Sequence, residues 1–212
     1  FGHKVFMKKY GRTYHLPMSP GVTNDDKVLR DLSSLTSADE VVFTEKMDGE
    51  NTTVHANGCH ARSPDSGSHA SRDWMKAFAA GISQSLEKNE RIIGEYLFAR
   101  HSVAYDKLPS YFLGFAWIVD GSVQSWDATV DRFNSLGVHP VSVLYRGAFT
   151  ETAVNDVLSG LDFRCQEGFV VRAAAGFQET DMATHMAKYV RADHVQSSTH
   201  WMHADIIRNR LV

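Results

Sequence analysis

The segment that says most about this 212-residue chain is Thr44-Glu45-Lys46-Met47-Asp48-Gly49-Glu50-Asn51. A lysine attacks as a nucleophile only after it loses a proton, and a desolvated or cationic site lowers the pKa of its amine. We expect Lys46 at the end of a strand, with Gly49 allowing a tight turn behind it and Asp48 close enough to orient the amine. Residue frequencies alone produce Lys-x-Asp-Gly in roughly one chain in twenty of this length. A strand entering an Asp-Gly turn is therefore the simpler explanation of this segment taken alone.

Further segments downstream give the lysine a context. They are Ile93-Gly94-Glu95-Tyr96, Tyr111-Phe112-Leu113-Gly114-Phe115-Ala116-Trp117, Glu167-Gly168-Phe169-Val170-Val171-Arg172 and Lys188-Tyr189-Val190-Arg191. In this order they resemble the covalent nucleotidyltransferase superfamily, which includes ATP-dependent RNA and DNA ligases and mRNA capping enzymes. The resemblance spans residues 41–191 and is strongest to RNA ligases of the phage and editing-ligase type. Each segment is common, but their joint occurrence is specific.

The resemblance implies an α+β fold, a nucleotidyltransferase (adenylyltransferase) domain with two antiparallel sheets flanking a nucleotide-binding cleft. The residues predict elements that suit this fold. Apolar residues that recur every four positions predict an amphipathic helix over 72–88, and Asn57-Gly58 predicts a hairpin turn. The remaining predictions are strands over 40–44, 91–98, 111–119, 169–172 and 187–190, a helix over 126–136 stopped by Gly137, and a helix capped by Thr150 that ends at Gly160.

We divide the chain into an adenylyltransferase domain, residues 1–191, and a C-terminal helical extension, residues 192–212. Asp193 is the expected cap of that extension. About twenty residues follow the last motif, which is too few for the OB domain that DNA ligases and capping enzymes append. We therefore expect no OB domain, and this favours RNA over DNA, because RNA ligases more often carry small helical or unrelated additions.

The composition is that of an ordinary globular protein, with 43% hydrophobic and 22% charged residues. No apolar run is long enough to span a membrane, so we expect no membrane partner. Cys59 and Cys165 are far apart in sequence and favour free thiols in a reducing compartment, with a single disulfide as the alternative. We expect a monomer in the cytoplasm (or in a nucleoid or nucleus).

The net charge of −3 shows that the chain is not coated in positive charge. Any nucleic acid must therefore meet a local basic groove. One candidate is the N-terminal cluster Lys4, Lys8, Lys9 and Arg12, which is interleaved with Tyr10 and Tyr14. A solvated surface segment explains the same cluster equally well.

The resemblance assigns Lys46 as the nucleophile, which would attack the α-phosphorus of ATP, release pyrophosphate and hold AMP through a phosphoramide bond. The backbone of Glu45 would meet the adenine edge. Arg62 would approach the ribose or a phosphate, since a guanidinium suits bidentate phosphate contacts. A surface arginine beside a Ser-Pro turn is the alternative, and Arg72 is a rival for the same role. Phe115 would stack on adenine, with core packing as the alternative.

Two carboxylates and two cations complete the site that the resemblance implies. Glu95, on an otherwise apolar strand, would contact the ribose or a metal-bound water. With Glu167 it would offer hard oxygen ligands, which suit Mg²⁺ (or Mn²⁺). Arg172 would lie near the phosphates. Lys188 would bind the α-phosphate, orient the leaving pyrophosphate and lower the pKa of Lys46.

The chain departs from the family pattern at Val190. Relatives often carry a second lysine there, two residues after the first. Arg191 follows, but on a strand its side chain would point to the opposite face. Either the register of the last motif or the number of phosphate-binding cations therefore differs from the pattern.

These features predict an ATP-dependent RNA ligase that joins 5′-phosphate and 3′-hydroxyl ends, with ATP and Mg²⁺ (or Mn²⁺) as cofactors and RNA as partner. By family analogy Lys46 is adenylylated, AMP moves to the 5′-phosphate, and the 3′-hydroxyl then displaces AMP. One alternative enzyme is an ATP-dependent DNA ligase or a GTP-using capping-type domain. Another is a non-catalytic nucleic-acid-binding domain of the same fold, which the intact Lys46, Glu95, Glu167 and Lys188 argue against.

Overall fold

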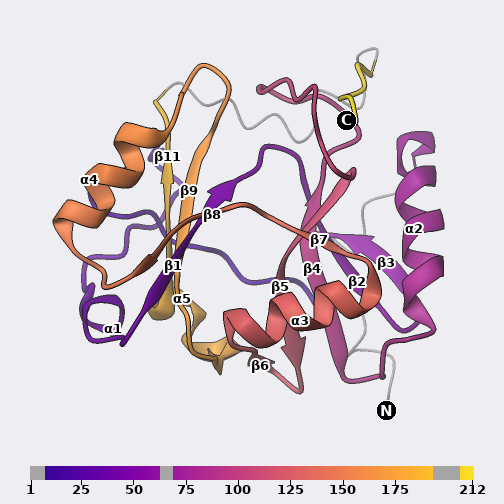
Figure 1. Ribbon diagram of the computed structural model, residues 1–212, viewed down its shortest axis with the longest axis horizontal. Helices are drawn as coiled ribbons and strands as arrows, with labels where there is room; N and C mark the ends of the chain where they lie inside the picture. The colour runs from indigo at the N-terminus through magenta and orange to yellow at the C-terminus, as the bar shows by residue number, and fades with distance from the viewer. Residues whose placement is uncertain (1–7, 63–68, 193–205) are drawn as a thin grey trace.

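Two β-sheets face each other in the computed structural model, which describes residues 8–62, 69–192 and 206–212 (Figure 1). Sheet A has four strands in the order β11-β9-β1-β8. All of its pairings are antiparallel. Its strands are β1 (Val41–Lys46), β8 (Val143–Gly147), β9 (Gly168–Ala173) and β11 (Met186–Val190).

Sheet B has seven strands, six of them in the order β10-β6-β5-β4-β2-β3. They pair antiparallel, and the short β7 alone pairs in parallel, with β5. The strands are β2 (Glu50–His55), β3 (Gly58–Ala61), β4 (Glu90–Tyr96), β5 (Phe112–Val119), β6 (Ser122–Val123), β7 (His139–Pro140) and β10 (Phe177–Gln178). The two expected antiparallel sheets are confirmed, apart from the two residues of β7.

Helices cover the outer face of each sheet (Figure 1). Apolar side chains of α2 (Asp73–Ser83) and α3 (Trp126–Leu136) pack on sheet B, and those of α1 (Ser33–Thr36) and α4 (Glu151–Gly160) pack on sheet A. The short α5 (Met182–His185) leads into β11, and two 3₁₀ turns span Ala70–Arg72 and Glu179–Asp181. No helix among the described residues has the length and apolar character needed to cross a membrane.

Three buried clusters result from this arrangement. One lies under α2 and α3, and a second lies under α1 and α4. The third lies between the sheets, where Ile93 and Ala116 of sheet B meet Met186 of sheet A and Tyr10 of the N-terminal segment. Apolar residues thus fill part of the space between the sheets, and charged residues occupy the ends.

Several local predictions are confirmed. The hairpin turns at Asn57-Gly58, between β2 and β3. Helix α3 spans the predicted residues and ends at Gly137, whose φ of 75° is left-handed and suits glycine. The Thr150 side chain accepts a hydrogen bond from Ala153 N and so caps α4. Helix α2 is shorter than predicted, because the chain turns at 84–86 instead of continuing to 88.

The C-terminal prediction is wrong for residues 206–212, which form no helix and lie extended along the loop after β4. The Asn209 side chain is 2% exposed and donates to the carbonyl of Leu97 at 2.8 Å, and Tyr111 donates to the carbonyl of Asn209. These bonds occupy backbone groups that a helix would use differently, so tertiary contacts override local propensity. Asp193, the expected cap, falls outside the described residues.

Candidate active site

Lys46 is the last residue of β1 and lies opposite Gly168 of β9. Its Nζ donates to Oε1 of Glu167 at 2.8 Å. The lysine side chain is 22% exposed and that of Glu167 only 1%. The nucleophile expected from the sequence therefore stands at the open end of a strand, in direct contact with a carboxylate expected in the same site.

Glu95 reaches the same place from sheet B. Its Oε1 accepts a hydrogen bond from Gly49 N at 3.1 Å, three residues after Lys46. A Cβ at Gly49 would lie 2.5 Å from the carbonyl oxygen of Tyr96, so no larger residue fits. Gly49 is therefore required by the close approach of the chain to β4. It has no positive φ, so a left-handed turn is not the reason for this glycine.

Asp48 anchors the segment behind the lysine. Its Oδ2 accepts from Ser102 Oγ at 2.9 Å and from Val103 N at 2.7 Å, and its own N–H donates to the hydroxyl of Tyr105. The expectation that Asp48 orients the Lys46 amine is thus replaced by a different role. Asp48 ties the Lys46 segment to the loop that follows β4, and only its charge acts on the amine.

Lys188 faces the site from β11, where it pairs with Val170. Strand β11 can approach β9 closely because residue 168 is glycine: a Cβ there would lie 1.9 Å from the carbonyl oxygen of Tyr189. Burial lowers the pKa of Lys188 to about 8, and Lys46 contributes in the same direction. Among the described residues no carboxylate lies within ion-pair distance of its Nζ. Lys188 is thus a cation that the described residues leave available to an anion.

The expected lowering of the Lys46 pKa is wrong for this arrangement. Burial disfavours the charged amine, but the carboxylates of Glu167 and Glu95 outweigh burial and raise the pKa. Burial also raises the pKa of Glu95 to about 8, with Lys46 acting in the opposite direction. The lowering of the Lys46 pKa was expected from nearby cations, whereas the charged group that contacts the amine in the structure is the carboxylate of Glu167.

The model of the RNA ligase family matches residues 39–190, which is most of the chain and includes all of these groups. The chain belongs to the RNA ligase family. No curated protein sequence matches it. The family assignment confirms the resemblance that the motifs carried.

Solved structures with a similar fold include other ligases. An archaeal ATP-dependent RNA ligase is 14% identical, with a TM-score of 0.61 over 87% of this chain and 48% of that one. A Naegleria gruberi RNA ligase variant with ATP and Mn gives 0.61 at 14% identity, over 87% of this chain and 56% of that one. A putative ATP-dependent DNA ligase from Aquifex aeolicus gives 0.57 at 15% identity, over 86% and 50%. The chain spans about half the length of these proteins, and the likeness establishes the shared fold.

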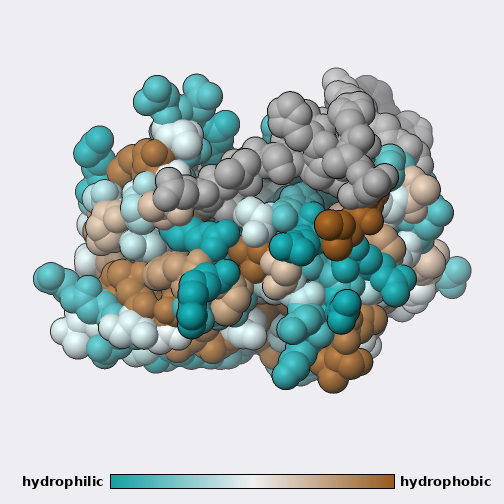
Figure 2. All heavy atoms as spheres, turned by 90° about the horizontal axis from the view of Figure 1, so that it is seen from above, coloured by the Kyte–Doolittle hydropathy of each residue, from teal (hydrophilic) through white to brown (hydrophobic). Residues whose placement is uncertain are grey.

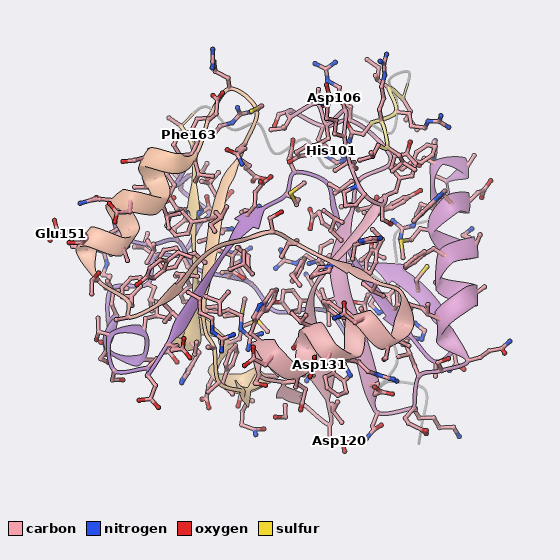
Figure 3. The ribbon with its side chains drawn as sticks, viewed as in Figure 1. His101, Asp106, Asp120, Asp131, Glu151 and Phe163 are labelled. Carbon is pink, nitrogen blue, oxygen red and sulfur yellow. The ribbon has the colours of Figure 1, made fainter. Side chains whose placement is uncertain are left out.

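The site of this family member lies at one end of the molecule. Phe163, before β9, and His101, after β4, lie at that end in the stick view (Figure 3). Arg191 joins the loop that carries Phe163 to the site. Its side chain donates to the carbonyl of Phe163, and its backbone N–H donates to the carbonyl of Glu167. Hydrophilic side chains gather along the middle of this face (Figure 2). The site is thus a polar region flanked by loops from both sheets.

Arg62 also faces the site. It follows β3 and is partly buried, and its charge acts on Glu95 and Lys188. Burial lowers its pKa, and Arg12 acts in the same direction. Its rival Arg72 forms an ion pair with Glu50, and its guanidinium lies 5.6 Å from the ring of Tyr96 on the outer side of sheet B. Of the two arginines, Arg62 is therefore the one whose charge acts on residues of the site, whereas Arg72 is occupied by Glu50.

Phe115 lies between the sheets at an irregular step of β5. Ile93 pairs with Ala116 and Gly94 pairs with Gly114, so Phe115 has no direct partner across the ladder. Its ring is partly buried and lies 5.7 Å from that of Tyr10. The ring belongs to the between-sheet packing and borders the site, so adenine stacking and core packing share one location.

Arg172 is placed away from Lys46. It is 2% exposed, and its guanidinium donates to the carbonyls of Ala173 and Gln124 at 2.9 and 2.8 Å. It also lies 5.1 Å from the ring of Phe177. These contacts support a structural role and not the expected phosphate contact, because backbone carbonyls already accept hydrogen bonds from the guanidinium.

Glu45 alternates with Lys46 along β1, so its side chain faces away from the amine and accepts from Gln166 at 2.8 Å. The backbone N–H of Glu45 donates to the carbonyl of Ser142 at 2.9 Å. That N–H is thus already used within the protein. This limits the backbone contact with adenine that the resemblance implied.

The packing around Val190 explains why this position does not carry the second lysine of the family pattern. Lys188 and Val190 point to the same face of β11, so a lysine at position 190 would share the face of Lys188. Val190 is 1% exposed, and its Cβ lies within 3.0 Å of where a Cβ of Gly21 would be. The N-terminal segment therefore fills the space that a second lysine would need.

Proposed function

We propose that the chain is the adenylyltransferase domain of an ATP-dependent RNA ligase, which joins 5′-phosphate and 3′-hydroxyl ends. One observation carries the proposal. Nζ of Lys46 contacts Glu167 at 2.8 Å at the end of β1, with Glu95, Arg62 and Lys188 around it. Family membership supports the ligase activity, since the family model covers all five residues.

In the first step the Lys46 amine attacks the α-phosphorus of ATP. The new N–P bond forms as the bond between the α-phosphorus and the bridging oxygen breaks, and pyrophosphate leaves with that electron pair. The amine must give up a proton, and Oε1 of Glu167 already accepts its hydrogen bond. The product is AMP joined to Nζ of Lys46, which stores the activated phosphate for transfer.

Cations of the chain would stabilise the phosphates during this step. Lys188 stands on β11 as a half-buried ammonium without an ion-pair partner among the described residues, so an anionic oxygen is its natural ligand. Arg62 approaches from β3 with a fork geometry that suits phosphate or ribose oxygens. Phe115 would close the adenine side of the site. Arg172 has no place in this proposal, because its donors serve the protein backbone.

A divalent cation fits the pair Glu95 and Glu167. Two hard carboxylates on facing sheets, both acting on Lys46, are the donors that Mg²⁺ or Mn²⁺ takes when phosphates and waters complete its shell. No cluster of three or more metal-ligating side chains occurs in the described parts of the chain, so substrate oxygens would have to complete the shell. When bound, the ion would offset the charge of the carboxylates and of the transferring phosphate.

The later steps use the same groups. AMP would pass from Lys46 to the 5′-phosphate of RNA, and the 3′-hydroxyl would then displace it to form the phosphodiester bond. Such chemistry suits RNA repair. The free thiols of Cys59 and Cys165 suit a reducing compartment, so we place the protein in the cytoplasm (or in a nucleoid or nucleus).

The test is covalent labelling followed by a sealing assay. The protein is incubated with α-labelled ATP or α-labelled GTP and Mg²⁺, then separated on a denaturing gel. We expect an adduct with ATP alone, and then sealing of nicked RNA in preference to nicked DNA. Labelling by GTP would indicate a capping-type domain, preferential sealing of DNA would indicate a DNA ligase, and no labelling would indicate a binding domain.

A further inference from the structure

An N-terminal strand segment extends sheet A beside the last motif. His15 forms an isolated parallel bridge with Lys188, Leu16 N donates to the carbonyl of Lys188 at 2.8 Å, and Lys188 N donates to that of Tyr14 at 2.9 Å. Residues paired across a ladder project to the same face. The side chain of His15 therefore projects to the face that carries Lys188.

His15 lies in a chain of polar contacts that starts at β11. Val190 N donates to Ser19 Oγ at 3.0 Å, and Ser19 Oγ lies 2.7 Å from Nδ1 of His15. Nε2 of His15 lies 3.3 Å from Oδ2 of Asp26. The ring is 1% exposed, so it is shielded from a substrate, and it lies against the carboxylate of Asp26 at the edge of the site.

Asp26 is held in its charged form. Thr23 donates to its Oδ2 through both N–H and hydroxyl, each at 2.9 Å. Burial opposes the charge of Asp26, but these hydrogen bonds outweigh burial and lower its pKa. Burial also lowers the pKa of His15, and Lys188 acts in the same direction. Nε2 of His15 faces the carboxylate at 3.3 Å without forming a hydrogen bond, so the two groups interact through their charges and their contact.

We propose that His15 and Asp26 are positioning residues of the adenylylation site: His15 lies against Asp26 on the face of β11 that carries Lys188, and the negative charge of Asp26 supports the binding of ATP phosphates by Lys188. The inference rests on the proposed function. It adds to the adenylylation site a segment of about fifteen residues that lies N-terminal to the residues matched by the family model.

The charges around Lys188 show why such a residue is needed. Lys46 of β1 and Arg62 after β3 disfavour a charged Lys188, and burial disfavours it most. Glu167, before β9, favours the charge, but Lys46 already holds its Oε1. Asp26 is the remaining carboxylate that favours it. The chain has Val190 in place of a second lysine, so loss of the Lys188 charge would remove the last cation of this motif on the cleft side.

The test compares Asp26→Asn with wild type by single-turnover labelling with ATP from pH 6 to 10. The second-order rate constant at low ATP reports groups of the free protein, whereas the rate at saturating ATP reports the complex. Asp26 favours the charged form of Lys188, so its removal makes Lys188 lose its proton at lower pH. We expect the alkaline limb of the second-order constant to move down by about half a pH unit or more, with a smaller change at saturating ATP.

Two further variants separate charge from folding. Asp25→Asn removes the same charge from an exposed neighbour that is not among the main groups acting on Lys188, and it should leave the alkaline limb in place. Asp26→Glu should restore the limb in part, because the charge returns with altered geometry. Thermal unfolding of each variant measures how far the segment remains folded.

The outcomes are distinct. A downward shift in Asp26→Asn alone supports the inference. A profile that overlays wild type, or a loss of rate that is equal at every pH, overturns it and leaves Asp26 as a structural residue. A wild-type protein that forms no adduct under any condition overturns the proposed function itself, and the inference with it.

Discussion

The two ends of the space between the sheets carry similar charges and use them differently. At one end Arg172 donates to backbone carbonyls, and Arg91 forms a two-nitrogen ion pair with Glu179. At the other end Lys46 has Glu167, but Lys188 has no ion-pair partner among the described residues. Arg172 pairs with Val42 of β1, and Lys46 lies four steps further along the same strand. At about 3.3 Å per step, the two positions are about 13 Å apart.

This contrast separates scaffold from site better than residue type does. An arginine whose guanidinium donates to backbone carbonyls stabilises the fold and has fewer donors left for a ligand. A half-buried lysine without a carboxylate partner, such as Lys188, is costly in the free protein, and binding an anion relieves that cost. The experiments below test where the boundary between the two ends lies.

Replacement of the nucleophile should have the largest effect. Lys46→Ala should abolish the labelled adduct, because it removes the amine that stands at the end of β1 to attack the phosphate. Lys46→Arg should fail as well, since a guanidinium stays protonated. The measurement is the gel assay with α-labelled ATP, with circular dichroism to show that the variants are folded. An adduct in Lys46→Ala would place the nucleophile elsewhere.

Glu167→Gln should be the next most severe change. It keeps the size of the side chain but removes the charge that contacts Lys46 and that would bind the metal ion. We expect adduct formation to slow by about 10²–10³-fold at saturating ATP, with a smaller effect on ATP affinity, because this charge acts mainly in the transition state. Single-turnover labelling across a Mg²⁺ titration measures both. A normal rate at limiting Mg²⁺ would remove Glu167 from the metal site.

Phe115 lies at the boundary between the two ends and tests how far the site reaches. If the ring stacks on adenine, Phe115→Ala should weaken ATP binding by roughly 1–3 kcal/mol, and Phe115→Trp should retain much of the affinity. Isothermal calorimetry on Lys46→Ala protein, with and without the second change, separates binding from chemistry. An unfolded Phe115→Ala protein with normal affinity in its folded fraction would assign the ring to the core.

Arg172 should give the smallest effect on labelling and a clear effect on stability. Arg172→Met removes the hydrogen bonds to the carbonyls of Ala173, Gln124 and Ala175, so we expect the free energy of unfolding to fall by about 2–4 kcal/mol. Adduct formation per folded molecule should stay close to wild type. Urea unfolding and active-fraction labelling measure the two quantities. A strong loss of labelling at unchanged stability would return Arg172 to the phosphate site.

Much of the site was predictable because motif spacing fixes strand ends. Lys46, Glu95, Glu167 and Lys188 each belong to a short segment that the sequence marks as strand or turn, and the structure brings all four together. The sequence predicted that a glycine is needed at position 49, but for a tight turn. The structural reason is the close approach of the Tyr96 carbonyl, at the end of β4 in sheet B.

The contacts that were missed depend on which distant segments meet. The burial of Arg172 depends on the carbonyl of Gln124, 48 positions away, and that of His15 on Lys188 at the far end of the chain. Residues 206–212 look helical only when their partners in the loop after β4 are ignored. Two-residue strands such as β6 and β10 are too short for any periodicity to show.

The extended segment at 206–212 also determines when, during synthesis, the Lys46 segment can form all of its contacts. Asn209 holds Tyr105 N through its side chain, and Tyr105 in turn accepts from Asp48 N, two residues after the nucleophile. Synthesis on a ribosome delivers Lys46 and all the other motif residues before Asn209 emerges. The hydrogen bonds that link Asn209 to the Lys46 segment therefore form only after the last motif has been translated. A nascent chain stalled before residue 206 should hold Lys46 in a less ordered and more protease-sensitive site than the chain through residue 212 does.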